Sequence, residues 1–226
     1  MQPYNIDKAS LSQAGLSALA SHRVLRNTYF LLSLTLIFSA GCATLAMMTE
    51  ARPMGFLPLM VIYIGLLMLI NFTRNSIWGI VSVFALTGFL GYTLGPLLNG
   101  ILHSVTNGGQ IIATAFGGTG LIFMGLSGYA LTSKRDFSPM AKGLTIGLLV
   151  AFVLGIAGIF FHLTALQLAV SAMFIVLSSG VILFQTSSII NGGETNYVMA
   201  TVTLYVSLFN IFVNLLQLLS AFSSRD

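Results

Sequence analysis

Charged residues are scarce in this chain of 226 residues: Asp, Glu, Lys and Arg make up 6%, whereas 56% of the residues are hydrophobic and the mean hydropathy is +0.96. An ordinary soluble domain is roughly a quarter charged. Because a soluble globule needs a polar surface to stay in water, this composition excludes a soluble fold. It predicts a protein whose solvent is the lipid bilayer.

Cysteine is nearly absent as well. The single Cys42 excludes an intrachain disulfide and a CxxC site, and we expect it to pack as a small side chain within its apolar run. The formal charge is +4, but Lys and Arg occur as singles and pairs at the edges of apolar runs. Nucleic-acid-binding proteins gather basic residues into a stripe, so this scatter predicts membrane orientation and no nucleic-acid partner.

Seven apolar segments are long enough to cross a bilayer, which needs about 20 helical residues. None of them contains Asp, Glu, Lys or Arg, and short turn-forming spacers separate them. The segments cover residues 28–48, 55–72, 78–98, 110–132, 143–161, 165–190 and 198–222. The lead before the first is long for a signal peptide, so we expect that segment to be retained. The sequence predicts an all-α, polytopic membrane protein with a cytoplasmic N-terminal arm (residues 1–27) and a seven-helix transmembrane domain (residues 28–226).

The positions of Lys and Arg predict the orientation, because basic residues are enriched on the cytoplasmic side. One side of the membrane would carry Lys8, Arg23, Arg26, Arg74, Lys134, Arg135 and Lys142, and the other side Arg52 and Arg225. We therefore expect a multi-pass protein of the bacterial inner membrane with a cytoplasmic N-terminus and a periplasmic C-terminus.

The sequence contains no catalytic constellation. His22, His103 and His162 are far apart and lack a metal-ligand spacing such as HExxH. All the acidic residues lie outside the apolar segments, which excludes paired-carboxylate catalysis within the bilayer. We expect a protein that is not an enzyme and has no metal or other cofactor.

Polar side chains form a seam along each of the last two segments. In the seventh, spacings of four, three, four and three residues place one set on a single helical face: Thr203, Ser207, Asn210, Asn214 and Gln217. In the sixth, a second set recurs every seven residues: Ser171, Ser178 and Gln185. Ser188 follows three residues after the last of them. An unpaired amide in hydrocarbon costs several kcal/mol, so both seams should face the bundle interior or water. The seams indicate either interhelical packing through hydrogen bonds or a hydrated passage or latch between the two helices.

Glycine pairs predict places where helices approach closely. Gly91 and Gly95 have the small-xxx-small spacing that brings another backbone near. We expect the same of the fourth segment, which contains Gly117, Gly118, Gly120, Gly125 and Gly128.

The most polar turn, residues 191–197, joins the last two segments. Gly192 and Gly193 can supply left-handed backbone, and we expect Thr195 or Asn196 to cap the next helix. We also expect Glu194 to pair with Arg74 at the inner end of the second segment. Such an exposed pair adds little stability but could hold a gate.

Four runs of the sequence are distinctive: HRVLRNTYFLLSLTL (22–36), TGFLGYTLGP (87–96), GGETNY (192–197) and LYVSLFNIF (204–212). They resemble bacterial members of the Bax inhibitor one family, also called the transmembrane Bax inhibitor motif family. The resemblance implies a seven-helix inner-membrane regulator that binds the membrane-anchored, ATP-dependent protease FtsH and restrains its proteolysis of membrane proteins. It also implies a slow FtsH substrate that the protease draws in through the cytosolic tail, here residues 1–27.

The wider family is linked to a calcium or other ion leak controlled by protonation of two acidic residues, and this leak is the alternative function. At the matching positions this sequence has Gln185 and Ser207, which do not titrate near neutral pH. We therefore expect no proton-controlled leak. Instead, Gln185 could bridge to Ser207 or Asn210 and keep the two helices closed.

Overall fold

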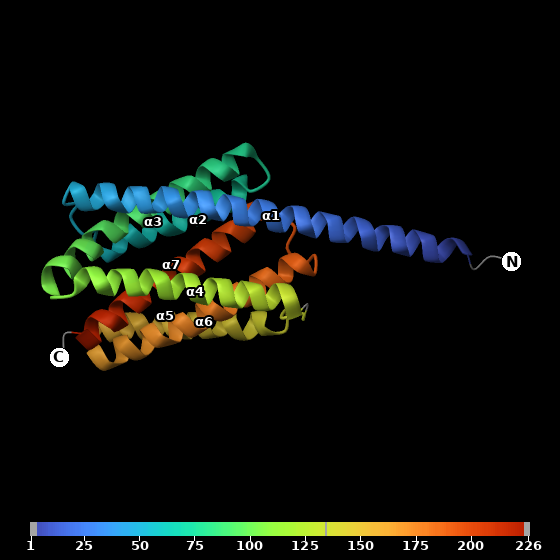
Figure 1. Ribbon diagram of the computed structural model, residues 1–226. Coiled ribbons are helices and arrows are strands. Elements are labelled where there is room, and N and C mark those ends of the chain that lie inside the picture. Colours follow the sequence, from blue (N-terminus) through green and yellow to red (C-terminus); the bar gives the residue numbers. More distant parts are fainter. Residues whose placement is uncertain (1–3, 134, 224–226) are drawn as a thin grey trace.

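The structure, a computed structural model, describes residues 4–133 and 135–223, with side chains from residue 19 onward. This part of the chain forms seven helices (Figure 1). They are α1 (Tyr4–Met48), α2 (Phe56–Thr73), α3 (Ile77–Ser104), α4 (Gly108–Ser133), α5 (Met140–Phe160), α6 (Thr164–Ile190) and α7 (Tyr197–Ser223). Each is long and apolar enough to cross a membrane. The predicted all-α fold with seven membrane-spanning helices is confirmed.

Helix α1 is longer than the first apolar segment. It runs without a break through residue 28, where the first predicted segment begins. Residues 16–40 contain neither glycine nor proline, so nothing in this stretch interrupts the helix. The N-terminal part of α1 therefore projects beyond the other helices as a continuation of the first membrane-spanning helix (Figure 1).

Helix α7 lies at the centre of the bundle. It packs against α6 and α4 on one side and against α1 and α3 on the other, whereas α2 packs mainly on α3 and α5 mainly on α6 (Figure 1). The main hydrophobic cluster joins Leu204 and Ile211 of α7 to Leu32 of α1, Leu86 of α3 and Ile182 of α6. All these side chains are buried, and α7 is the helix that α1, α3, α4 and α6 all contact.

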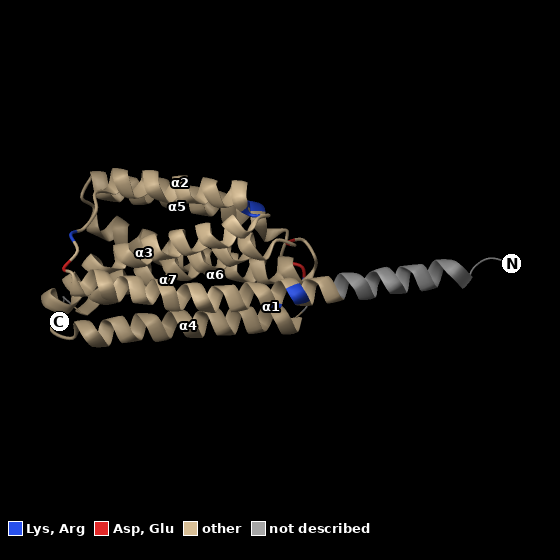
Figure 2. Cartoon of the chain, turned by 90° about the horizontal axis from the view of Figure 1, so that it is seen from above, with Lys and Arg blue, Asp and Glu red and all other residues tan. Residues whose placement is uncertain are grey.

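Charge is confined to the ends of the described bundle. Figure 2 shows Lys, Arg, Asp and Glu at the helix ends and turns, while the long walls carry none. Large apolar side chains are instead exposed along these walls, for example Val61 of α2, Phe116 of α4 and Val153 of α5. In water this surface would be unstable, but in lipid it matches its solvent.

Close packing between α1 and α3 depends on glycine. A Cβ atom at Gly91 would meet the Ser39 carbonyl oxygen, and one at Gly95 would meet the Ala46 side chain. The predicted close approach at these two glycines is confirmed, with α1 as the partner.

The prediction for the glycines of α4 was wrong. A Cβ at Gly117, Gly120, Gly125 or Gly128 would find no neighbour within 4 Å, and one at Gly118 would make only an ordinary contact, 3.5 Å from Leu215. The spacing was suitable, but this face of α4 is turned away from the other helices.

Candidate functional site

The polar features of the bundle concentrate at one end, which we call the tail end. Here α2, α4 and α6 finish, α3, α5 and α7 begin, and α1 projects outward. The turns at this end are joined to one another and to α1 by side-chain hydrogen bonds. The tail end is therefore a connected polar layer beneath an apolar bundle.

Asn196 connects two turns of the tail end. Its Oδ1 accepts hydrogen bonds from the backbone N–H groups of Val198 (3.0 Å) and Met199 (3.1 Å), which caps α7 as predicted. Its Nδ2 donates to the Arg74 carbonyl oxygen (3.1 Å) and to Asn75 Oδ1 (2.9 Å) in the turn between α2 and α3. One amide thus starts a helix and holds a neighbouring turn.

The expected ion pair between Glu194 and Arg74 does not form between these two described residues. Glu194 Oε1 instead accepts a hydrogen bond from the backbone N–H of Asn196 (2.8 Å). The backbone of Gly192 has a positive φ of 75°, as expected, and the N–H groups of Gly193 and Glu194 both donate to the Ser188 carbonyl oxygen. Backbone hydrogen bonds and the Asn196 side chain hold this turn, rather than an ion pair.

Ser187, near the end of α6, fixes the turn between α4 and α5. Its hydroxyl donates to the Arg135 carbonyl oxygen (2.8 Å) and accepts from the backbone N–H of Phe137 (3.1 Å). Within this turn Ser138 hydrogen-bonds to Asp136 and lowers the pKa of that carboxyl. The sequence analysis missed Ser187, because its partners are two main-chain groups fifty or more positions away.

Helix α1 is tied to the tail end of α6 and α7. Tyr29 and Thr186 share a hydrogen bond of 3.4 Å between their hydroxyls, and the Thr201 hydroxyl contacts the Thr28 carbonyl oxygen at 3.3 Å. Thr186, Thr201 and Thr28 are fully buried. The helix that leaves the bundle is thus anchored at its point of departure.

Members of the polar seam of α7 form hydrogen bonds within their own helix. The Ser207 hydroxyl donates to the Thr203 carbonyl oxygen (2.8 Å), and Asn214 Nδ2 donates to that of Asn210 (2.7 Å). Such bonds to the preceding turn remove the need for a partner on another helix. Ser207 is buried, Asn210 and Asn214 are half-buried, and Gln217 is exposed, so the seam passes from the core to the surface.

The expected bridge from Gln185 is not made. Gln185 and Ser178 of α6 are buried, yet Gln185 Nε2 has no hydrogen-bond partner. Ser207 uses its hydroxyl within α7, where it donates to the Thr203 carbonyl oxygen. Packing rather than a polar latch therefore holds α6 and α7 together at this level.

A buried tyrosine makes the interhelical hydrogen bonds that the seams do not. Tyr205 of α7 shares a hydrogen bond of 2.6 Å with the Ser39 hydroxyl of α1 and donates to the Thr87 carbonyl oxygen of α3 (3.2 Å). Tyr205 is 2% exposed. The three central helices therefore meet at one hydroxyl group.

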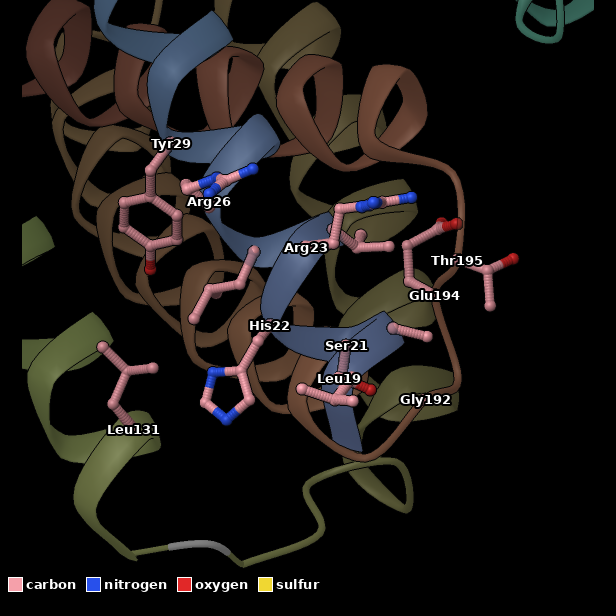
Figure 3. Close-up of a pocket in the computed structure, with 13 residues that line it drawn as sticks. Leu19, Ser21, His22, Arg23, Arg26, Tyr29, Leu131, Gly192, Glu194 and Thr195 are labelled. Atoms are coloured by element: carbon pink, nitrogen blue, oxygen red, sulfur yellow. The ribbon is translucent and has the colours of Figure 1, made fainter. Parts of the chain in front are cut away.

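A pocket lies at the tail end (Figure 3). Its volume is about 1180 Å³, and it lies between the exit of α1, the end of α4 and the turn after α6. In Figure 3, His22 and Tyr29 project from α1 on the side of Leu131, while Arg23 lies on the side of Glu194. Among the residues described, no group of three His, Cys, Asp or Glu side chains forms a metal site.

Fold and site together define a polytopic helical membrane protein with a polar tail end. The chain belongs to the family described as inhibitor of apoptosis-promoting Bax1, whose model matches residues 21–224. It is 52% identical over 210 residues to the modulator of FtsH protease YccA of Escherichia coli K12, a match covering 93% of this chain and 94% of that protein. A second Escherichia coli strain, O6:H1, has an inner membrane protein YccA with the same identity and coverage. An uncharacterized protein of Pseudomonas aeruginosa is 44% identical over 225 residues, which is 100% of this chain and 99% of that one. The predicted family membership is confirmed, and the chain is a multi-pass protein of the inner membrane.

Proposed function

We propose that this protein is a modulator of an FtsH-type membrane protease, which it binds and restrains without catalysing a reaction itself. The observation that carries the proposal is the 52% identity, over 93% of the chain, to a protein named for that role. The alignment covers nearly all of both chains, so it includes the helices that form the central contacts.

The geometry suggests how such a protein could restrain a protease. A protease that extracts membrane proteins must pull each helix out of its neighbours. Here α1 leads outward, and the same helix is fixed to α3 at Gly91 and Gly95 and to α7 through Ser39 and Tyr205. Pulling on α1 therefore acts directly against the centre of the bundle. A protease engaged on this chain would process it slowly and have less capacity for other substrates.

The orientation belongs to the same proposal. The tail end carries Arg23, Arg26, Arg74 and Arg135, whereas Arg52 lies in the turn at the opposite end. Basic residues favour the cytoplasmic side, so the tail end would face the cytoplasm, where an ATP-driven protease can reach α1. In a Cys42→Ala background, a membrane-impermeant maleimide added to intact cells should label Arg52→Cys and leave Thr195→Cys unlabelled. The reverse pattern would overturn this orientation.

The central test is degradation in a reconstituted membrane. The full chain should co-purify with FtsH from mild detergent and slow the proteolysis of a second membrane substrate. Deleting residues 1–21 should slow degradation of the chain itself, because the protease loses its point of entry. Equal degradation rates for the truncated and full-length chains would contradict entry through the tail. Failure of the full chain to change proteolysis of the second substrate would contradict the modulator function.

Gln185 and Ser207 separate this proposal from a proton-controlled ion leak. Neither side chain titrates near neutral pH. Ser207 donates its hydroxyl to its own helix and Gln185 is buried, so these positions have no switch between protonation states. We therefore propose a modulator rather than a proton-gated channel.

A further inference from the structure

The tail-end pocket combines basic and apolar side chains around the exit of α1. Three side chains that can carry positive charge, His22, Arg23 and Arg26, line it from α1 and are exposed. Glu194 is the one acidic residue among the lining residues of this pocket, and its Oε1 accepts a hydrogen bond from the turn. The pocket therefore has an excess of positive charge and favours an anion.

Two arginines are well placed for a phosphate group. Arg23 and Arg26 are three residues apart in one helix, so they lie on neighbouring positions of its surface. Guanidinium groups are weakly hydrated and match the geometry of phosphate oxygens. Both also lie just before the charge-free run of residues 28–48 in α1, where long basic side chains can reach lipid headgroups.

The remaining walls are apolar. Leu25 and Tyr29 line the pocket from α1, and Leu131 lines it from the last turn of α4. Leu131 is 39% exposed, and Phe30, which follows Tyr29, is 67% exposed. The pocket therefore has an apolar part beside its basic residues, next to exposed apolar side chains of the bundle wall.

We propose that this pocket binds an anionic phospholipid of the membrane leaflet at the tail end. The phosphate would lie against Arg23 and Arg26, and an acyl chain would follow Leu25, Tyr29 and Leu131 into the bilayer. A free phosphate ion would leave the apolar walls without a partner. An acidic peptide would have to place its polar backbone against the same walls, which is unfavourable.

A bound lipid would also act on the helix that leaves the bundle. The pocket spans α1, α4 and the turn after α6, so a lipid in it contacts three separate elements at once. It would thereby strengthen the attachment of α1 at its point of departure. This binding is a property of the chain alone and can be measured without any protease.

The test uses the full chain, purified in detergent and delipidated, with native mass spectrometry as the measurement. The probes are dioleoylphosphatidylglycerol, dioleoylphosphatidylethanolamine, glycerol 3-phosphate and an acidic peptide. We expect the anionic lipid to bind more tightly than the zwitterionic lipid, and glycerol 3-phosphate and the peptide to bind weakly or not at all. Arg23→Gln and Arg26→Gln should each weaken binding of the anionic lipid about five-fold, since each basic residue near an anionic lipid contributes about that factor.

Two further variants separate the pocket from general electrostatics. Arg74→Gln removes a positive charge from the same end of the molecule, outside the pocket, and should leave lipid binding unchanged. Glu194→Gln keeps the oxygen that accepts from Asn196 but removes the negative charge, and should tighten binding. Unchanged melting temperatures without lipid would show that each variant is folded.

Several results would overturn the proposal. Equal affinity for the two lipids, or equal losses in Arg74→Gln and Arg23→Gln, would show that the pocket does not select an anionic lipid. Glycerol 3-phosphate binding as tightly as the lipid would show a site for a soluble phosphate. Tight binding of the acidic peptide in place of the lipid would show a protein interface.

Discussion

The contact between α1 and α3 allows a quantitative prediction for Gly91→Ala. The added methyl group would collide with the main chain of Ser39, whose carbonyl carbon would lie 2.9 Å from the new Cβ and whose hydroxyl oxygen would lie 2.6 Å away. A main-chain neighbour cannot rotate aside, so α1 has to shift relative to α3. Forcing an extra carbon into a tight contact costs about 1–3 kcal/mol.

Gly117→Ala is the matched control. It lies within a membrane-spanning helix, α4, but a Cβ there would meet nothing within 4 Å. Replacing glycine by alanine in a helix interior also gains up to about 1 kcal/mol from backbone propensity. This gain is common to both variants, so their difference isolates the collision. We expect Gly91→Ala to be about 1–3 kcal/mol less stable than Gly117→Ala.

Thermal unfolding in a mild detergent measures this difference. For a chain of this length, 1 kcal/mol corresponds to about 2–4 °C in Tm, so we expect Gly91→Ala to melt roughly 2–12 °C below Gly117→Ala. Because Ser39 also holds Tyr205, the shift of α1 should weaken that hydrogen bond as well. Equal melting temperatures for the two variants would refute the conclusion that the α1–α3 backbone contact is tight.

Further variants at three places test other parts of the bundle. Tyr205→Phe removes the hydrogen bonds to Ser39 and Thr87 while keeping the ring. The free energy of unfolding should therefore fall by about 0.6–2 kcal/mol per bond. Denaturation in detergent measures this loss, with Phe209→Leu as a packing control. Asn196→Ala should lower stability by about 1 kcal/mol through loss of the α7 cap, and by more if the bonds to the α2–α3 turn contribute. Asn196→Asp keeps the cap and loses the donated bonds, so a melting temperature equal to that of the alanine variant would assign the whole effect to the turn. The double variant Gln185→Asp with Ser207→Asp should introduce a pH-dependent calcium flux in liposomes, because it adds two titratable carboxyls to the bundle. A flux that already varies with pH in the unmodified protein would contradict the absence of a proton-controlled leak.

The sequence predicted the helices well because membrane spans depend on local composition. Hydrocarbon-length runs without charge identify a span whatever its neighbours are, and all seven helices overlap the predicted segments. Their ends differ by a few residues, except in α1, which begins at Tyr4. An apolar run can indicate where a helix meets lipid, but it does not say where a helix ends in water.

The contacts between helices were predictable only in part. Gly91 and Gly117 both lie on glycine-rich helices, yet one touches a backbone and the other faces open space. Spacing determines which residues share a face, and the fold decides where that face points. The seam of α7 shows the same limit: Asn210 and Asn214 share a stripe as predicted, but the Asn214 amide donates to the Asn210 carbonyl oxygen of its own helix rather than to α6.

The missed residues have partners that are remote in sequence. Ser187 bonds to main-chain groups of the turn between α4 and α5, and Tyr205 bonds to Ser39 and Thr87 on two other helices. A single serine or tyrosine in an apolar run forms no sequence pattern that would predict hydrogen bonds to distant parts of the chain. Asn196 was partly predictable, because asparagine at the start of a helix is a common cap, but its bonds to the turn after α2 were not.

The central place of α7 bears on how the protein is made. Ribosomes synthesise helices in chain order, so α1, α3, α4 and α6 enter the bilayer before α7, the helix against which all four pack. Until α7 is present, Leu204, Tyr205 and Ile211 are missing from the middle of the bundle, and α1 and α3 lack their shared partner. The central contacts of the bundle can therefore form only after α7 has been synthesised.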